Sequence, residues 1–262
     1  MKFSIKDLTK LTNEVCMIVK SASLILNKET VIAYDSYNPS TNIDIEISDF
    51  LTISLTQLVN LPVISEENTP KENLHQKGFS WVIDPLDGTL NVLTKNTPYC
   101  ISVSLVDLDS LEALLSCNYI PYDKEMYYAI KGQGAFLNEY KITNQNYSNR
   151  IISYGLPNDT IENIDFHLNH IKAVLETGFI TRQRGSASYD ILMAASGKYY
   201  AFYEFGLFLW DFIGADLFAK ECGCKSIYRQ SNKRKNNSFQ YDYIVSGNLN
   251  NLNNIKKILN YD

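Results

Sequence analysis

An acidic turn at residues 84–89 is the part of this sequence best suited to chemistry. It carries two carboxylates three residues apart, Asp84 and Asp87, with a proline between them and Gly-Thr directly after them. The preceding apolar segment, 79–83, has the composition of a strand. A turn at a strand end can direct two carboxylates and a hydroxyl at one point, and hard divalent cations prefer such oxygen ligands. The pattern therefore favours a cation site that binds a phosphate.

Two other acidic segments could complete the same site. Glu66-Glu67 follows a short apolar segment, 63–65, and Trp210-Asp211 lies far downstream. Each of these segments also has a purely structural interpretation. Asp-Gly marks turns, and an Asp near a helix start caps the helix. Adjacent glutamates are commonly solvated. The complete string at 84–89 is more specific than a single Asp-Gly turn. Glu67 and Asp211, taken alone, fit either the structural interpretation or the site.

Hydrophobic patterning predicts the elements that must position these acids. Apolar residues at helical spacing predict helices, and short apolar or alternating runs bounded by turn residues predict strands. In the first half we expect helices at 7–27 and 43–59, strands at 63–65, 79–83, 100–106, 111–119 and 126–130, and a turn-rich loop at 34–41. In the second half we expect strands at 151–154, 179–180, 199–205, 225–228 and 243–245, and helices at 161–176, 186–195, 211–222 and 248–259.

These elements predict a layered α+β fold in which helices and sheets alternate. With 262 residues and no internal repeat or low-complexity linker, the chain is expected to form one compact domain, 1–262. Within it, the subregion 1–148 carries the acidic turn and the upstream acids. The subregion 149–262 carries the last acid and the side of the site that faces the substrate.

Bulk composition narrows the functional class. The net charge of −5 argues against a nucleic-acid scaffold, which usually has a basic face, so we expect no nucleic-acid polymer as a partner. We expect no membrane span, because no run approaches the roughly 18 apolar residues that a span needs, and no signal peptide. The five cysteines are scattered and odd in number, which indicates reduced thiols in a cytoplasmic protein.

The acidic string Asp84-Pro85-Leu86-Asp87-Gly88-Thr89, with Asn91 after it, resembles the signature of the inositol monophosphatase family. This family consists of magnesium-dependent, lithium-sensitive phosphomonoesterases. Three other stretches resemble family motifs in the same order: Ile64-Ser65-Glu66-Glu67, Arg182 with Gly185-Ser186-Ala187, and Glu204-Phe205-Gly206 with Trp210-Asp211. The resemblance implies an αβαβα sandwich of the sugar-phosphatase type and a phosphoric monoester hydrolase.

The resemblance also implies the ligands of two Mg²⁺ ions. Glu66, Asp84 and the carbonyl of Leu86 would hold the first ion. Asp84, Asp87 and Asp211 would hold the second, so Asp84 serves both. Two such ions can stabilise the attacking and the leaving oxygen in the hydrolysis of a phosphate ester.

Further roles carry over from the same resemblance. Glu66 and Thr89 would orient and help deprotonate the attacking water, and the backbone amides of Gly88 and Thr89 would cradle the phosphate. Ser186 and Ala187, at a helix start, would contact the substrate through backbone N–H groups. Glu204 would accept hydrogen bonds from a ring hydroxyl and repel a second phosphate.

The expected reaction is hydrolysis of a sugar or polyol monophosphate, a small phosphorylated metabolite, by metal-activated water. One alternative is a 3′(2′),5′-bisphosphate nucleotidase, for which the basic run at 233–235 could grip the extra phosphate. A second alternative is a non-catalytic family member that binds a phosphorylated ligand. Relatives are commonly dimers, so the resemblance implies a homodimer.

The segment 34–44 departs from the family pattern, which has a Lys, a following Asp and a Thr-x-x-Asp string there. No Lys counterpart is found, Asp49 is a candidate for the last acid of the string, and Asp44 is a candidate for another. This loop serves a loosely held third metal ion in relatives, so whether two or three Mg²⁺ ions bind stays open. His167 and His170 fall outside every motif, and we expect them on the surface.

Overall fold

The computed structural model describes residues 3–27, 32–35, 38–67, 77–145, 149–156, 164–231 and 240–261. Its helices are α1 (Ile5–Ala22), the 3₁₀ helix η1 (Ser23–Asn27), α2 (Asn42–Leu58), α3 (Thr89–Leu93), α4 (Ile164–Glu176), α5 (Ala187–Ala195), α6 (Leu209–Glu221) and α7 (Leu249–Ile258). Its strands are β1 (Ile32–Asp35), β2 (Asn38–Thr41), β3 (Val63–Ser65), β4 (Phe79–Asp87), β5 (Cys100–Asp107), β6 (Glu112–Ile120), β7 (Glu125–Ile130), β8 (Gly134–Leu137), β9 (Tyr140–Ile142), β10 (Ile151–Tyr154), β11 (Ile180–Arg182), β12 (Ala201–Leu207), β13 (Lys225–Gln230) and β14 (Tyr241–Ser246).

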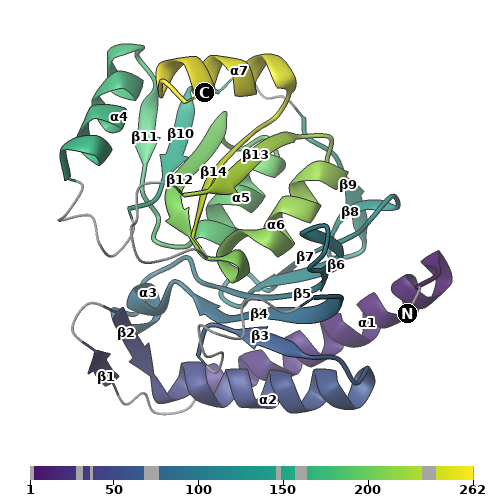
Figure 1. The fold of residues 1–262 in the computed structure, drawn as a ribbon. Coiled ribbons are helices and arrows are strands. Elements are labelled where there is room, and N and C mark those ends of the chain that lie inside the picture. The colour runs from purple at the N-terminus through teal and green to yellow at the C-terminus, as the bar shows by residue number, and fades with distance from the viewer. Residues whose placement is uncertain are drawn as a thin grey trace.

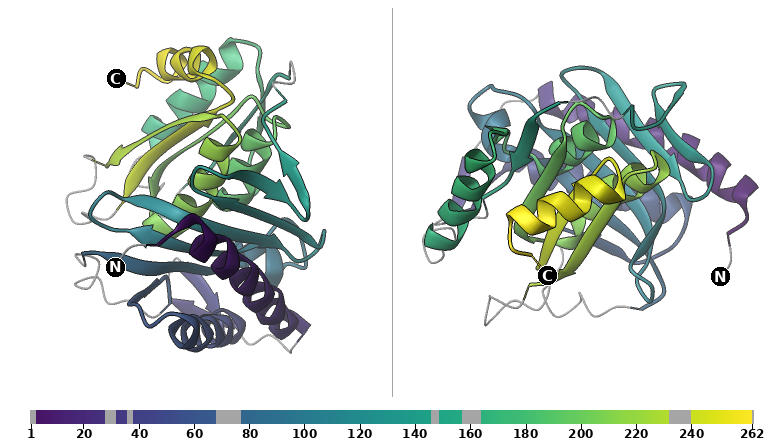
Figure 2. Two further views of the ribbon diagram at one scale, coloured as in Figure 1. Left: turned by 90° about the vertical axis from the view of Figure 1, so that its right-hand side faces the viewer. Right: turned by 90° about the horizontal axis from the view of Figure 1, so that it is seen from above.

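Helices and two mixed sheets alternate in layers (Figure 1). The larger sheet has seven strands in the order β3-β4-β5-β6-β7-β8-β9, and the smaller has five in the order β11-β10-β12-β14-β13. Helices α1 and α2 cover one face of the larger sheet, α5 and α6 lie between the sheets, and α4 and α7 cover the far face of the smaller sheet (Figure 2). This is the αβαβα order, so the predicted fold class is confirmed.

A capping box fixes the start of helix α2. The hydroxyl of Thr41 accepts hydrogen bonds from the backbone N–H groups of Ile43 and Asp44 at 3.1 and 3.3 Å. The Asp44 carboxylate in turn accepts the N–H of Thr41 at 2.8 Å and also contacts its hydroxyl. Because these bonds satisfy N–H groups that a first helical turn leaves without partners, they hold both the helix end and the Asp44 carboxylate in place.

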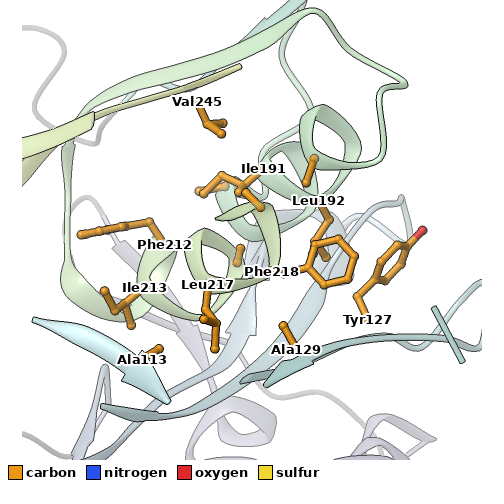
Figure 3. Close-up of a cluster of buried hydrophobic side chains, with 14 of the residues drawn as sticks. Ala113, Tyr127, Ala129, Ile191, Leu192, Phe212, Ile213, Leu217, Phe218 and Val245 are labelled. Carbon is orange, nitrogen blue, oxygen red and sulfur yellow. The ribbon is translucent and has the colours of Figure 1, made fainter. Parts of the chain in front are cut away.

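The middle helical layer forms the core between the two sheets. Helix α6 is buried on almost every side, which is typical of a helix with a sheet on each face. Figure 3 shows Phe218 of this helix next to Tyr127 of the larger sheet, and their rings meet edge to face with centroids 5.5 Å apart. Val245 of the smaller sheet and Ile191 of α5 close the cluster from the other side.

In the outer layer, the two histidines of α4 do not lie on the surface as expected. His167 is buried with 5% of its surface exposed, and His170 is half-buried. The ring nitrogens of His170 lie 2.6 Å from the carbonyl oxygen of Phe166 and 3.1 Å from that of Leu259. Histidines three residues apart share one helix face, and here that face is turned inward.

Other differences from the sequence prediction concern short elements. Within the segment 34–41, expected to be a loop, β1 and β2 pair antiparallel with Tyr34 opposite Pro39. The strands β8 and β9 and the five-residue helix α3 were not expected either. An element of three to five residues carries too few positions to show a period, so hydrophobic patterning detects it only where it forms a distinct apolar run, as at 63–65 and 151–154.

The state of the cysteines agrees with the expectation from composition. All five cysteines are free thiols. Within the described ranges, no helix combines the length and the apolar character that a bilayer crossing requires.

Replacement of Phe218 by Ala should lower the free energy of unfolding by about 3–5 kcal/mol, because a fully buried ring would leave a cavity between the sheets. Urea denaturation followed by circular dichroism measures this change. Ile53→Ala is the matched control, since that α2 side chain is 59% exposed, and it should stay within about 0.5 kcal/mol of the unchanged protein. Equal effects of the two substitutions would contradict the assignment of the core.

Candidate active site

Two parallel strands bring the first acids together. Strands β3 and β4 pair in parallel, with Ser65 opposite Ile83, so Glu66 and Asp84 follow at the same edge of the larger sheet. The N–H of Glu66 lies 3.4 Å from the carbonyl oxygen of Ile83. Asp84 is almost fully buried and Glu66 is partly exposed. Sequence reasoning placed these two carboxylates in one site, and the structure makes them neighbours.

The acidic turn itself departs from regular strand geometry. Strand β4 is irregular between Asp84 and Asp87, where its pairing with β5 shifts register. One carboxylate oxygen of Asp84 accepts the N–H of Leu86 at 3.0 Å, which stabilises the turn locally. Gly88 then adopts a positive φ of 101° and starts helix α3. A Cβ at Gly88 would lie 3.0 and 3.1 Å from the carbonyl oxygens of Pro98 and Gly185, so both the conformation and the close packing require glycine.

Asp87 joins the acidic turn to the start of helix α5. Its carboxylate accepts hydrogen bonds from the Ser186 hydroxyl at 2.8 Å, the Ala187 N–H at 3.2 Å and the Ser188 N–H at 2.6 Å. The resemblance assigned Ser186 and Ala187 to substrate contacts. In the structure, the N–H of Ala187 is directed at Asp87, and the substrate role of these two residues stays a prediction.

Asp211 lies in the first turn of helix α6, on the other side of the cluster. Its carboxylate accepts the N–H of Phe208 at 2.7 Å, which is the helix-capping role that competed with the site hypothesis. The hydroxyl of Ser188 donates to the carbonyl oxygen of Asp211 at 3.0 Å, so α5 and α6 start side by side. Trp210, one residue earlier, is buried and stacks on Phe208. Asp211 therefore caps a helix and also faces the other acids.

Burial and mutual repulsion raise the pKa values of these carboxyls. Burial raises the pKa of Glu66, Asp84 and Asp211 well above the ordinary range, and repulsion by neighbouring carboxylates raises it further. For Asp87, burial outweighs the hydrogen bonds from α5 and raises the pKa to about 6. Burial is the main cause that raises the pKa of Glu67 to about 7, and the charge of Asp44 adds to it.

The donor set of this cluster fits a hard cation. Every neighbouring charge that raises the pKa of Glu66 or Asp84 belongs to another carboxylate, and carboxylate oxygens are the ligands that Mg²⁺ and Ca²⁺ prefer. Within the described ranges, no three acidic, histidine or cysteine side chains are arranged as a ready-made metal cage. The acids are nevertheless close enough to repel one another, so a cation among them would relieve that repulsion.

Asp44 is the site residue that sequence reasoning placed least well. The hydroxyl of Thr89 donates to the Asp44 carboxylate at 2.9 Å and lies 3.1 Å from the carbonyl oxygen of Leu86. Asp44 also raises the pKa of Glu66. Asp49, the candidate for the last acid of the loop motif, is exposed on α2. The signal that could have found Asp44 is the spacing Thr41-x-x-Asp44, which reads equally well as an ordinary capping box.

The predicted substrate-side residues lie on the smaller sheet. Glu204, on β12, is 9% exposed, and its charge contributes to the raised pKa of Asp211. Arg182 is exposed at the end of β11 and donates to the carbonyl oxygen of Thr181. The basic run at 233–235 lies outside the described residues. Glu204 is therefore the substrate-side candidate that the structure brings to the acids.

Asn91 links the two sides of the site. Its side-chain amide donates to the carbonyl oxygens of Pro98 at 2.5 Å and Arg184 at 2.8 Å. It thereby ties helix α3 to the loop before α5. The sequence resemblance included this residue without giving it a role.

Comparison with known proteins agrees with this geometry. The family model "Inositol monophosphatase family" matches residues 6–259. The inositol monophosphatase of Dictyostelium discoideum is 30% identical over 227 residues, which cover 84% of this chain and 81% of that protein. A putative Nus factor SuhB of Neisseria meningitidis is 35% identical over 148 residues, 55% of this chain and 56% of that protein. This chain also resembles the crystal structure of an IMPase/NADP phosphatase complexed with Mg²⁺ and phosphate. The alignment spans 97% of each chain, with a TM-score of 0.79 and 22% sequence identity.

The layered fold and the acidic cluster thus define a phosphoric monoester hydrolase. The chain belongs to the inositol monophosphatase family, as its motifs predicted.

In buffer that contains a chelator, the free energy of unfolding should fall as the pH rises from about 4 to about 7. A carboxyl with a raised pKa binds its proton more tightly in the folded state than in the unfolded state. It therefore favours folding below its ordinary pKa, and this contribution is lost as the pH rises through the raised value. Thermal denaturation at a series of pH values measures the trend, and added MgCl₂ should reverse it near pH 7.

Asp84→Asn should flatten this pH dependence, because it removes one of the repelling charges and leaves the fold intact. Asp123→Asn, at an exposed position, is the control and should leave the slope unchanged. A large loss of thermal stability in Asp84→Asn without metal would contradict the repulsion on which this prediction rests.

Proposed function

We propose that this protein is a magnesium-dependent phosphatase that hydrolyses a sugar or polyol monophosphate with a water molecule as the nucleophile. The observation that carries the proposal is the gathering of Glu66, Asp84, Asp87 and Asp211 from three segments of the chain, close enough to raise one another's pKa. Carboxylates that raise one another's pKa in a buried cluster are a recognised sign of a functional site. The solved IMPase/NADP phosphatase, complexed with Mg²⁺ and phosphate, supports magnesium as the cation.

The chain offers two overlapping sets of oxygen ligands. Glu66, Asp84 and the carbonyl of Leu86 would hold one ion, and Asp84, Asp87 and Asp211 a second. Bound Mg²⁺ would supply charge stabilisation and acidify a water molecule. The carboxylates of Asp84 and Asp87 already accept backbone N–H groups on one side, which limits their rotation. A metal titration counts the bound ions and tests for a third one near Asp44.

The side chains of Thr89 and Glu66 would act on the water. Because the Thr89 hydroxyl donates its hydrogen to Asp44, its oxygen is left with lone pairs that can accept a hydrogen from water. This would orient a water oxygen toward phosphorus, and Glu66 would accept the proton that leaves. Water adds to phosphorus as the bond to the alcohol oxygen breaks, so the products are the free alcohol and inorganic phosphate.

The phosphate would lie at the start of helix α3. The N–H groups of Gly88 and Thr89 can face an anion there, and the positive end of the helix adds a favourable dipole. Gly88 lets the backbone turn tightly between two carbonyl groups, and no side chain would crowd the bound phosphate.

Glu204 supports a polyol over a bisphosphate as the substrate. A buried carboxylate accepts hydrogen bonds from neutral hydroxyls, and it repels a second phosphate group. The nucleotidase alternative and the non-catalytic alternative both remain outcomes of the experiments below. A homodimer and a cytoplasmic location stay predictions from the family resemblance and the composition.

The purified protein should release phosphate from inositol 1-phosphate in the presence of Mg²⁺ more efficiently than from adenosine 3′,5′-bisphosphate. Fructose 1,6-bisphosphate completes the panel, and malachite green measures the phosphate at each Mg²⁺ concentration. A preference for the adenosine compound would favour the nucleotidase. Absence of Mg²⁺-stimulated release from all three would favour the non-catalytic alternative.

Thr89→Val should lower kcat by about 10²-fold or more, because it keeps the size of the side chain and removes the hydroxyl that orients water. Thr89→Ser keeps that hydroxyl and is the matched control, expected within about tenfold of the unchanged enzyme. Asp44→Asn combined with Thr89→Val should be no slower than Thr89→Val alone, since the two residues act through one hydrogen bond. Additive losses would show that Asp44 does not act through Thr89.

A further inference from the structure

The carboxylate of Glu204 occupies the space next to Gly155 where any other residue would carry its side chain. A Cβ built on Gly155 would lie 1.7 Å from Oε2 of Glu204, 2.1 Å from its Cδ and 2.6 Å from its Oε1. These distances are far below van der Waals contact, so the two side chains cannot coexist in this arrangement. Sequence reasoning gave Gly155 no role.

Strand pairing explains why these two residues meet. Strands β10 and β12 run in parallel with Tyr154 opposite Tyr203, and Gly155 and Glu204 are the next residue on each strand. The N–H of Gly155 donates to the carbonyl oxygen of Tyr203 at 3.2 Å, so the pairing continues beyond the end of β10. Neighbouring residues at one level of a sheet share a face, and here the Glu204 side chain bends over the bare Cα of Gly155.

We propose that Gly155 is a positioning residue that sets substrate selectivity by making room for the Glu204 carboxylate. The proposal rests on the proposed function, in which Glu204 binds substrate hydroxyls. The absence of a side chain at position 155 leaves the space that the Glu204 carboxylate fills. A larger residue at 155 would turn Glu204 away from this position and so change which substrates the site prefers.

The atoms that an added Cβ at position 155 would meet predict a shift of the Glu204 carboxylate rather than of the backbone. All three atoms nearest the added Cβ belong to the end of the Glu204 side chain, which can rotate without moving the backbone. At Gly88, by contrast, an added Cβ would meet backbone oxygens, and the positive φ adds strain. A methyl group at position 155 should therefore cost little stability and mainly displace the carboxylate.

Gly155→Ala should raise the ratio of KM for inositol 1-phosphate to KM for p-nitrophenyl phosphate about tenfold, the loss expected for one hydrogen bond to a charged group. The second substrate lacks ring hydroxyls, so it reports changes that are not specific to the polyol. Gly178→Ala is the control: its added Cβ would meet the end of Arg150, next to the opposite end of β10, and its φ of 80° adds strain, so it should lower stability but leave the ratio unchanged. An unchanged ratio in Gly155→Ala, with an increased ratio in Glu204→Gln, would overturn the proposal.

A double substitution tests whether Gly155 acts through Glu204. Glu204→Asp shortens the side chain by one methylene group and withdraws the carboxylate from the space next to position 155. The ratio for Gly155→Ala combined with Glu204→Asp should therefore equal that of Glu204→Asp alone. Independent effects that multiply would overturn the proposal, because residues that act through one contact are not additive.

A crystal structure of Gly155→Ala separates this inference from the proposed function. If neither Gly155→Ala nor Glu204→Gln changes the ratio, Glu204 does not select polyols and the proposed substrate class fails. A displaced carboxylate in that crystal structure would still support the positioning role. A carboxylate that keeps its place while β10 and β12 move apart would overturn that role whatever the kinetics.

Discussion

The structure depends on keeping several buried and half-buried carboxylates together where they repel one another. Burial is the main cause of the raised pKa values of Asp84, Asp211 and Glu66, and repulsion between the neighbouring carboxylates adds to it. The fold offsets part of that effect with backbone N–H groups: Leu86 donates to Asp84, and Phe208 donates to Asp211. These bonds fix the carboxylates without neutralising them, so the attraction for a cation is retained.

The layered architecture is what allows acids from distant parts of the chain to meet. Glu66 and Asp84 follow two parallel strands of the larger sheet, and Asp211 begins a helix that lies between the sheets. Helix α5 completes the arrangement, because its first N–H groups bind Asp87 and its Ser188 hydroxyl binds the carbonyl of Asp211. Strand ends and helix starts therefore converge at one edge of the αβαβα sandwich.

Much of this arrangement could be predicted from the sequence because its signals are local. The string at 84–89 combines a buried strand, two Asp residues and a Gly-Thr turn, and few structural roles require all of them at once. Asp44 was harder to place, since its spacing from Thr41 is also that of a plain helix cap and only the fold shows that Thr89 lies beside it. The inward turn of His167 and the pairing of β1 with β2 depend on neighbours distant in sequence, which no local pattern contains.

The bond between Asp87 and the start of α5 joins residues about one hundred positions apart in the chain. During synthesis the acidic turn leaves the ribosome long before its partner, so a nascent chain holds these acids without the amides that orient them. The carboxylate of Asp87 is therefore fully hydrogen-bonded only once the start of α5 has packed against the acidic turn. A chain that ended before residue 188 would lack the backbone amides that orient this carboxylate.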